Sequence, residues 1–513
     1  MKTILQRQLS YRKRRIAHRN RVRQWRAQDR PMFRGGNIRY ECSGRDRGIG
    51  CGGIGAMYLM AKNIGLLDGI DRDLHLLKVH LPYHESDHVI NVALNILAGG
   101  ECLQDLELLR NDEAFLDALG ASRIPDPTTA GDFCRRFDAQ SIGILQNTIN
   151  QTRLKVWSRQ GPDFLGQAII EADGTLAPTT GECKQGMDIA YNGTWGYHPL
   201  IVSLANTKEP LFVVNRSGNR PSHDGAHEYF DKSIALCREA GFKSILLRGD
   251  TDFSQTRHLD RWNAQKEVRF ILGIDAMKNL KALADGLPDS AWTRLVRPER
   301  YQVKTEPRER PQNVKERIVR DREFDNIRLV SEDVAECEYQ PVACQQAYRL
   351  VVVRKNLSIE KGEAVLFDDI RYFFYITNIR DQAAQEIVFS ANDRCDQENL
   401  IQQLKQGVHA TRNPVDTLES NWAYMVMASL AWTLKAWLGL SLPVAPGRWA
   451  GRHREQKQQI IRMEFRRFLN TFIRLPCQII KTGRRLVYRL LGWNQSLDVF
   501  LRAFEAVRRP MLQ

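Results

Sequence analysis

The sequence predicts a mixed α/β fold, with a central sheet flanked by helices and with helical regions toward both ends. Short apolar runs between residues 168 and 273 have the length and composition of strands, and helical patterns separate several of them. Residues 55–160 and the region from residue 455 onward instead repeat apolar side chains at helical spacing. Strands and helices in this order predict a mixed sheet with helices on its faces.

The predicted strands of the first half follow one another closely. A strand at 168–173 precedes a meander of short strands between residues 188 and 216, in which Gly193 and Gly196 mark turns. The expected order then continues with a helix at 226–240, a strand at 244–250, a helix at 256–265 and a strand at 268–273.

The second half of the chain differs from the first in its residue pattern. Residues 276–385 contain charged, alternating stretches typical of strands, the strongest at 371–377, and look inserted into the core. Residues 419–440 predict a buried helix. A chain of 513 residues also exceeds what one hydrophobic core usually supports. We therefore expect a basic arm (1–50), a helical DNA-binding or packing region (51–165), the first part of a core (166–275), a β-rich insertion (276–385), the second part of the core (386–445) and a basic helical C-terminal region (446–513).

Positive charge is concentrated at the two ends of the chain. The 75 Lys and Arg residues outnumber the 60 Asp and Glu residues. Residues 1–39 hold 13 basic residues and one acidic residue, and residues 448–513 hold 15 and four, so the middle is acidic. Basic ends favour a polyanionic partner, either nucleic acid or an anionic membrane surface. The cluster best suited to DNA phosphates in the arm consists of Arg12, Lys13, Arg14 and Arg15.

Cysteine usage and hydropathy indicate a reducing compartment and no membrane span. The ten cysteines form no CxxC pair, and several lie in apolar patterns typical of buried free thiols. The arginine-rich N-terminus lacks the apolar stretch of a secretory signal. The most apolar window, 424–442, contains Lys435 and several polar residues, so we expect a buried helix there.

Three acidic residues are candidates for metal-dependent catalysis. Asp173 and Asp250 each end a predicted strand, and Glu398 lies on a predicted helix. Together, two strand-end aspartates and a helical glutamate can hold two divalent metal ions, which can cut and rejoin a phosphodiester backbone. A single strand-end aspartate is often only a turn residue. By spacing alone Glu171 and Asp252 remain alternatives, because alternate residues of a strand share a face.

Glu398 lies between two basic residues at helical spacing. At about 100° per residue, Arg394 lies about 40° to one side of Glu398 and Lys405 about 20° to the other. This pattern is common for surface ion pairs. The functional interpretation assigns the glutamate to metal and the two bases to DNA phosphates.

Taken together, these motifs resemble bacterial insertion-sequence transposases of the DDE class, which have a ribonuclease-H-like catalytic core. Glu171–Thr175 is similar to the first catalytic-aspartate motif, and Leu247–Asp250 is similar to the second. The spacing of Arg394, Glu398 and Lys405 resembles the signature of members with a β-rich insertion before the catalytic glutamate.

The resemblance implies an enzyme that cuts double-stranded DNA at the terminal inverted repeats of a mobile element and joins the ends to target DNA. It also implies two Mg²⁺ or Mn²⁺ ions, with Asp173 bridging both and with Asp250 and Glu398 each completing one site. A homodimer that holds paired DNA ends in the bacterial cytoplasm, associated with the nucleoid, is likewise implied. The family signature has a tyrosine where this chain has Ala391.

Other features and other functions remain open. Trp292 and Tyr301 are candidates for stacking on a flipped base, and packing within the protein is the alternative. His223 and His227 are candidates for zinc ligands, and a place at the start of a helix is the alternative. The chain could instead be a metal-dependent nuclease without strand transfer, or a catalytically inactive DNA-binding regulator. Retention of all three carboxylates argues against the regulator.

Overall fold

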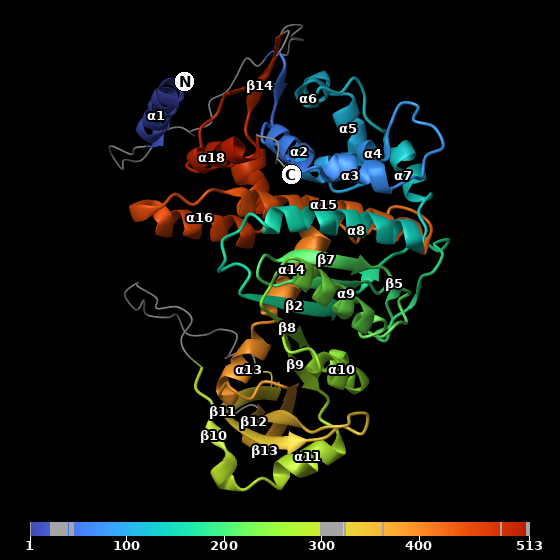
Figure 1. Ribbon diagram of the computed structural model, residues 1–513, viewed down its shortest axis with the longest axis vertical. Coiled ribbons are helices and arrows are strands. Elements are labelled where there is room, and N and C mark those ends of the chain that lie inside the picture. Colours follow the sequence, from blue (N-terminus) through green and yellow to red (C-terminus); the bar gives the residue numbers. More distant parts are fainter. Residues whose placement is uncertain are drawn as a thin grey trace.

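The computed structural model describes residues 2–20, 39, 46–297, 322, 325–361, 364–482 and 485–508. It is a mixed α/β protein, as the sequence predicts. A layer of helices occupies one end of the long axis, a large sheet runs through the middle, and the β-rich segment forms the other end (Figure 1).

The central part of the large sheet combines parallel and antiparallel strands. β2 lies in the middle, parallel to β8 and antiparallel to β6. β9 continues the sheet parallel to β8, and β7 continues it antiparallel to β6. These strands match the predicted ones: β2 (Gln167–Gly174), β6 (Leu200–Leu204), β7 (Glu209–Val214), β8 (Ser244–Gly249) and β9 (Val268–Ile274).

The β-rich segment extends this same sheet. β13 pairs with β9, so the nine strands run in the order β10-β11-β12-β13-β9-β8-β2-β6-β7. The new strands are β10 (Thr293–Arg294), β11 (Asp325–Tyr339), β12 (Tyr348–Lys361) and β13 (Ala364–Thr377). Helix α11 (Lys278–Asp285) packs against this part of the sheet, where Asp285 accepts a 2.6 Å hydrogen bond from the Tyr372 hydroxyl.

The helical layer at one end of the molecule is built mainly from the N-terminal half of the chain. It comprises α2 (Ile54–Asn63), α3 (Leu66–Asp73), α4 (Glu85–Ala98), α5 (Leu106–Arg110), α6 (Glu113–Leu119), α7 (Pro127–Cys134) and α8 (Ala139–Trp157). Between strands lie α9 (Ala226–Glu239) and α10 (Leu259–Asn263), and a small three-stranded sheet contains β3 (Ala177–Pro178), β4 (Asp188–Ile189) and β5 (Trp195–Tyr197).

The long helix α15 (Leu418–Ser441) is buried between the helical layer and the sheet, which confirms the predicted buried helix (Figure 1). Its only lysine, Lys435, is fully buried and donates a 2.8 Å hydrogen bond to the carbonyl oxygen of Ile461. Burial lowers the pKa of Lys435 well below its ordinary value. Among the described residues, no helix is both long enough and apolar enough to cross a membrane.

The two ends of the chain differ from the predicted arm and helical tail. The arm begins with a helix, α1 (Lys2–Asn20), and β1 (Gly48–Ile49) pairs with β14 (Cys477–Thr482). β14 continues into a hairpin with β15 (Arg485–Leu490), which lies between α16 (Ala450–Arg462) and α18 (Leu497–Val507) in the chain. Alternating burial along β14, with Cys477 and Ile479 inside, is a period of two that the helical prediction missed.

The glycine-rich segment before α2 serves a close backbone contact. The amides of Gly52 and Gly53 donate to the carbonyl oxygens of Leu475 and Ile473, at 2.9 and 3.0 Å. A Cβ on Gly53 would overlap the carbonyl oxygen of Phe472. Glycine is therefore required here by the approach of two backbones.

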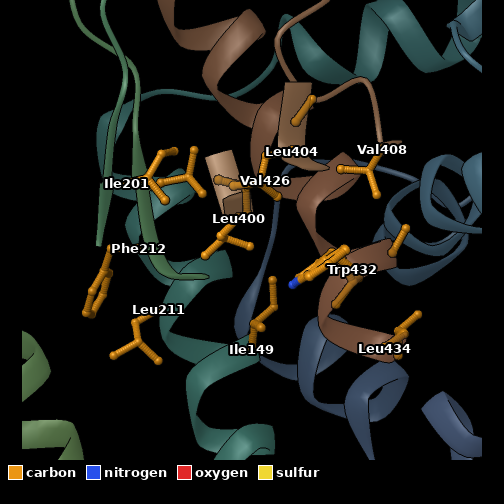
Figure 2. Close-up of a cluster of buried hydrophobic side chains, with 14 of the residues drawn as sticks. Ile149, Ile201, Leu211, Phe212, Leu400, Leu404, Val408, Val426, Trp432 and Leu434 are labelled. Carbon is orange, nitrogen blue, oxygen red and sulfur yellow. The ribbon is translucent and has the colours of Figure 1, made fainter. Parts of the chain in front are cut away.

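The helix that carries Glu398 is anchored in the main core. α14 (Cys395–Gln402) runs into a π-helical turn (Gln403–Gly407). Figure 2 shows Leu400 and Leu404 in a cluster with Ile201 of β6 and Val426 of α15. These contacts hold α14 against the central sheet.

Candidate active site

Asp173 and Asp250 lie at the same edge of the sheet. Asp173 is the penultimate residue of β2, and Asp250 directly follows β8. Because β2 and β8 are parallel neighbours, their carboxyl ends meet. The Asp250 side chain also caps a short 3₁₀ turn by accepting a 3.1 Å hydrogen bond from the amide of Asp252.

Arg394 joins the two aspartates. Its Nη2 atom lies 3.6 Å from Oδ2 of Asp173 and 3.4 Å from Oδ2 of Asp250. The Nε atom of Arg394 is buried and has no hydrogen-bond partner among the described residues. The two carboxylates thus share one positive charge, and the arginine retains an unused donor.

Glu398 lies at the margin of this group, on α14, with an exposed side chain. Its negative charge nevertheless contributes to the raised pKa of Asp173. Within the part of the chain that is described, no group of three or more His, Cys, Asp or Glu side chains is close enough to hold a metal ion. The structure therefore brings Asp173 and Asp250 together around Arg394 and leaves Glu398 facing solvent.

Burial and mutual repulsion disfavour two negative charges on the aspartate pair. Burial, followed by repulsion from Asp250, raises the pKa of Asp173 from 3.8 to about 7, against the attraction of Arg394. Burial also raises the pKa of Asp250, and Arg394 again opposes the shift. Carboxylate oxygens are preferred ligands of Mg²⁺, so the chemistry of this pair fits a divalent cation.

The segment from Arg394 to Lys405 is not the single α-helix that the sequence predicts. Helix α13 (Ala384–Asn392) ends before Arg394, which is the N-cap of α14, and Lys405 lies in the π-helical turn. Its ammonium group donates to the carbonyl oxygen of Leu176 at 2.8 Å and to Oγ1 of Thr175 at 3.2 Å. Lys405 therefore holds the loop that follows Asp173.

The two alternative acids occupy different surroundings. Glu171 is 1% exposed and forms a 2.5 Å ion pair with the buried Arg248, which also donates to the carbonyl oxygen of Ser390 at 2.7 Å. Asp252 lies on the exposed 3₁₀ turn after Asp250. Glu171 thus serves an internal ion pair two residues before Asp173.

Two neighbours of the carboxylates are not among the site residues that the sequence predicts. Gln397, directly before Glu398, is buried and hydrogen-bonds to β6. His198 is buried beside Gly174, and its Nδ1 atom lies 2.6 Å from the carbonyl oxygen of Arg220. Both residues act through contacts that are made only in the folded chain.

Two of the other aromatic and histidine candidates, His227 and Trp292, are engaged in packing. His227 stacks on His258, with ring centres 4.3 Å apart. The guanidinium of Arg354 lies 4.2 Å from the ring centre of Trp292. Tyr301 lies outside the described residues.

The four residues of the basic cluster in the arm differ in their surroundings. Arg12 donates to the carbonyl oxygens of Leu490 and Gly492, at 2.6 and 3.3 Å, and so docks α1 against the C-terminal region. Lys13, Arg14 and Arg15 are exposed.

Comparison with known families adds a decisive observation. The family model described as transposase DDE domain group 1 matches residues 36–510. The chain belongs to this transposase family. No match was found among proteins of curated function. Among solved structures, this transposase is distantly similar to the piggyBac transposase in its synaptic complex with hairpin DNA, with a TM-score of 0.35 and 11% identity over 82% of each chain.

Proposed function

We propose that this transposase cuts DNA at the terminal inverted repeats of a mobile element and joins the ends to target DNA. Asp173, Asp250 and Glu398 are its catalytic carboxylates, and they hold two Mg²⁺ or Mn²⁺ ions. The observation that carries the proposal is the convergence of Asp173 and Asp250 on one cationic group, in a chain of the DDE family.

The order of the central strands supports a ribonuclease-H-like core. β7, β6 and β2 are antiparallel, and β2, β8 and β9 are parallel, with the two aspartates at the ends of the adjacent strands β2 and β8. We assign this core to residues 166–275 and 386–445, with residues 276–385 as its insertion. Residues 51–165 form the helical DNA-binding region, and residues 446–513 form the basic C-terminal region.

The chain's own residues prepare the site for metal and DNA. The three carboxylates would hold two divalent metal ions, which would supply activation of water or a DNA 3′-OH and stabilisation of the leaving oxygen. Arg394 would then turn from the aspartates to a DNA phosphate, which its planar fork suits. Lys405 supports the loop after Asp173 and supplies positive charge beside the DNA path.

The charge at the chain ends supports a DNA-binding role for the arm. Exposed Lys13, Arg14 and Arg15 contact DNA phosphates, and Arg12 anchors the helix that presents them. We propose a homodimer that pairs two element ends, in a protein of bacterial insertion-sequence type that acts on the nucleoid in the cytoplasm.

Cleavage of labelled element-end DNA in Mg²⁺ tests the catalytic assignment. Asp173→Asn, Asp250→Asn and Glu398→Gln should each reduce cutting to background, whereas the exposed neighbour control Asp252→Asn should keep it. Undiminished cutting by one of the three variants would remove that residue from the mechanism.

Pre-cut element ends incubated with target DNA test the joining reaction. Products of strand transfer are expected, and hydrolysis alone would instead indicate a nuclease.

A further inference from the structure

We propose that Gln397 is a positioning residue that sets the location of Glu398 relative to Asp173. This inference rests on the proposed function of the three carboxylates. Gln397 immediately precedes Glu398 on α14 and is 1% exposed, whereas Glu398 itself faces solvent. The two adjacent side chains thus point in different directions, one into the protein and one toward the edge of the site.

Both ends of the Gln397 amide are bonded to the same strand. Its Nε2 donates a 3.0 Å hydrogen bond to the carbonyl oxygen of Ile201, and its Oε1 accepts a short hydrogen bond from the hydroxyl of Ser203. Two bonds from one planar amide define direction as well as distance. They fix the rotation of α14 above β6.

The strand that receives these bonds is paired with the strand of Asp173. Ile201 lies opposite Asp173 in the β2–β6 ladder, and Ser203 lies opposite Glu171. Glu398 is therefore connected to Asp173 through the Gln397 side chain and the paired strands β6 and β2, with no loop between them. A shift of the Gln397 amide along β6 would move Glu398 past Asp173 by the same amount.

The other described contacts of α14 do not bond it to β6, although Arg394 and Lys405 at its two ends contact Asp173 and the loop after it. The helix spans only Cys395–Gln402, between the N-cap Arg394 and a π-helical turn. Leu400 and Leu404 hold it against the core, but apolar contacts lack direction (Figure 2). Asp396 pairs with Lys208 at 2.8 Å, yet the Asp396 side chain is 52% exposed, and such a pair contributes little.

The positioning role predicts a particular kind of loss. Gln397→Leu leaves the carbonyl of Ile201 and the hydroxyl of Ser203 without their buried partner, so the protein should melt at a lower temperature. A displacement of about 1 Å at a catalytic group can cost about 100-fold in rate. We expect single-turnover cleavage of bound DNA to fall at least about tenfold, and half-maximal cleavage to require more Mn²⁺.

Asn378→Leu is a matched control. Asn378 is a half-buried amide that directly follows β13, outside the proposed DNA-binding region; it donates hydrogen bonds of 3.0 Å to Oδ1 of Asn263 and 3.1 Å to the carbonyl oxygen of Val268, and accepts one from the amide of Phe270. Its loss should lower thermal stability comparably and leave the cleavage rate of the folded protein and its Mn²⁺ dependence unchanged. A Gln397→Leu protein that behaves like Asn378→Leu would overturn the proposal.

Three further measurements keep the test decisive. Stabilisation of the DNA-free protein by Mn²⁺, read from its melting temperature, should be weaker in Gln397→Leu than in wild type. Ser203→Ala removes one of the two hydrogen bonds to Gln397 and is expected to fold. It should show the same changes to a smaller degree, and wild-type behaviour would count against the positioning role of Gln397.

If Glu398→Gln cleaves normally, the proposed function fails. If it is inactive while Gln397→Leu matches wild type, only the positioning role fails.

Discussion

The folded protein disfavours the negative charge of Asp173. Its pKa is raised to about 7, so the folded state binds a proton more tightly than the unfolded chain does, and ionisation costs stability as the pH rises from about 4 to about 7. The cost is absent in acid and complete above the raised pKa. A cation bound at this position would recover it.

Replacing Asp173 with Asn should therefore stabilise the metal-free protein. The gain should be about 4 kcal/mol at pH 8, because a shift of about three pKa units at about 1.4 kcal/mol each is then fully expressed, and less than half of that at pH 5. Thermal unfolding in a chelator at both pH values measures it, with Asp252→Asn as the control. An equal or larger gain at pH 5 would contradict the burial argument.

Arg394 partly supplies the positive charge that the aspartate pair requires. Arg394→Gln removes it from between Asp173 and Asp250, so the metal-free protein should be destabilised at pH 8. Millimolar Mg²⁺ should then raise the melting temperature of Arg394→Gln more than that of wild type. Arg412→Gln, which affects an exposed pair with Glu101, provides the control. Equal Mg²⁺ responses in all three proteins would show that Arg394 does not stand in for a metal.

Among the elements, β2 and β8 are held together by the buried pair Glu171–Arg248 as well as by their ladder. The pair lies two residues before each aspartate and reaches α13 through the carbonyl of Ser390. It thus links the strand of Asp173 and the strand before Asp250 to the segment that leads to Arg394.

Breaking one side of this pair should be costly. Arg248→Met leaves the Glu171 carboxylate buried and unpaired, with an expected loss of about 3–5 kcal/mol in the free energy of unfolding. The double variant Glu171→Leu/Arg248→Met should recover much of that loss, because no isolated charge remains. Urea denaturation of Arg248→Met, Glu171→Leu and the double variant measures the coupling free energy between the two side chains. Strictly additive losses of stability would exclude such a coupling.

Periodicity predicted the strands and most helices because their burial pattern is local. Strand β2 and helix α15 follow directly from apolar runs. The path around Glu398 does not, because the N-cap at Arg394 and the π-helical turn at Lys405 depend on contacts with the sheet. The hairpin β14–β15 was missed although the alternation along β14 is local; only its third strand, β1, comes from the opposite end of the chain.

The candidate site was predicted in part for the same physical reason. Asp173 and Asp250 are marked by strand ends, so their meeting follows from parallel pairing. The shared contact with Arg394, the internal role of Glu171 and the clamp by Gln397 are tertiary contacts that no spacing encodes.

At the scale of the whole molecule, the basic ends flank an acidic middle and should govern DNA affinity. Replacing the exposed Arg14 and Arg15 with Ala should reduce the slope of log affinity against log salt by about 0.9 for each phosphate that the arm no longer binds. Arg12→Ala should instead loosen α1, because Arg12 is bonded to Leu490 and Gly492. DNA titrations at several salt concentrations test this; an unchanged slope in the Arg14/Arg15 variant would reject the arm as a DNA-binding element.

The central claim is that Asp173, Asp250 and Glu398 form one two-metal site on DNA. The most direct measurement is anomalous diffraction from crystals of the transposase bound to element-end DNA and Mn²⁺. The account predicts two Mn²⁺ ions about 3.5–4 Å apart, both in contact with Asp173, with Asp250 and Glu398 each on one ion and Arg394 turned away. Mn²⁺ bound without Asp173, or Arg394 still between the aspartates while metal lies elsewhere, would contradict it.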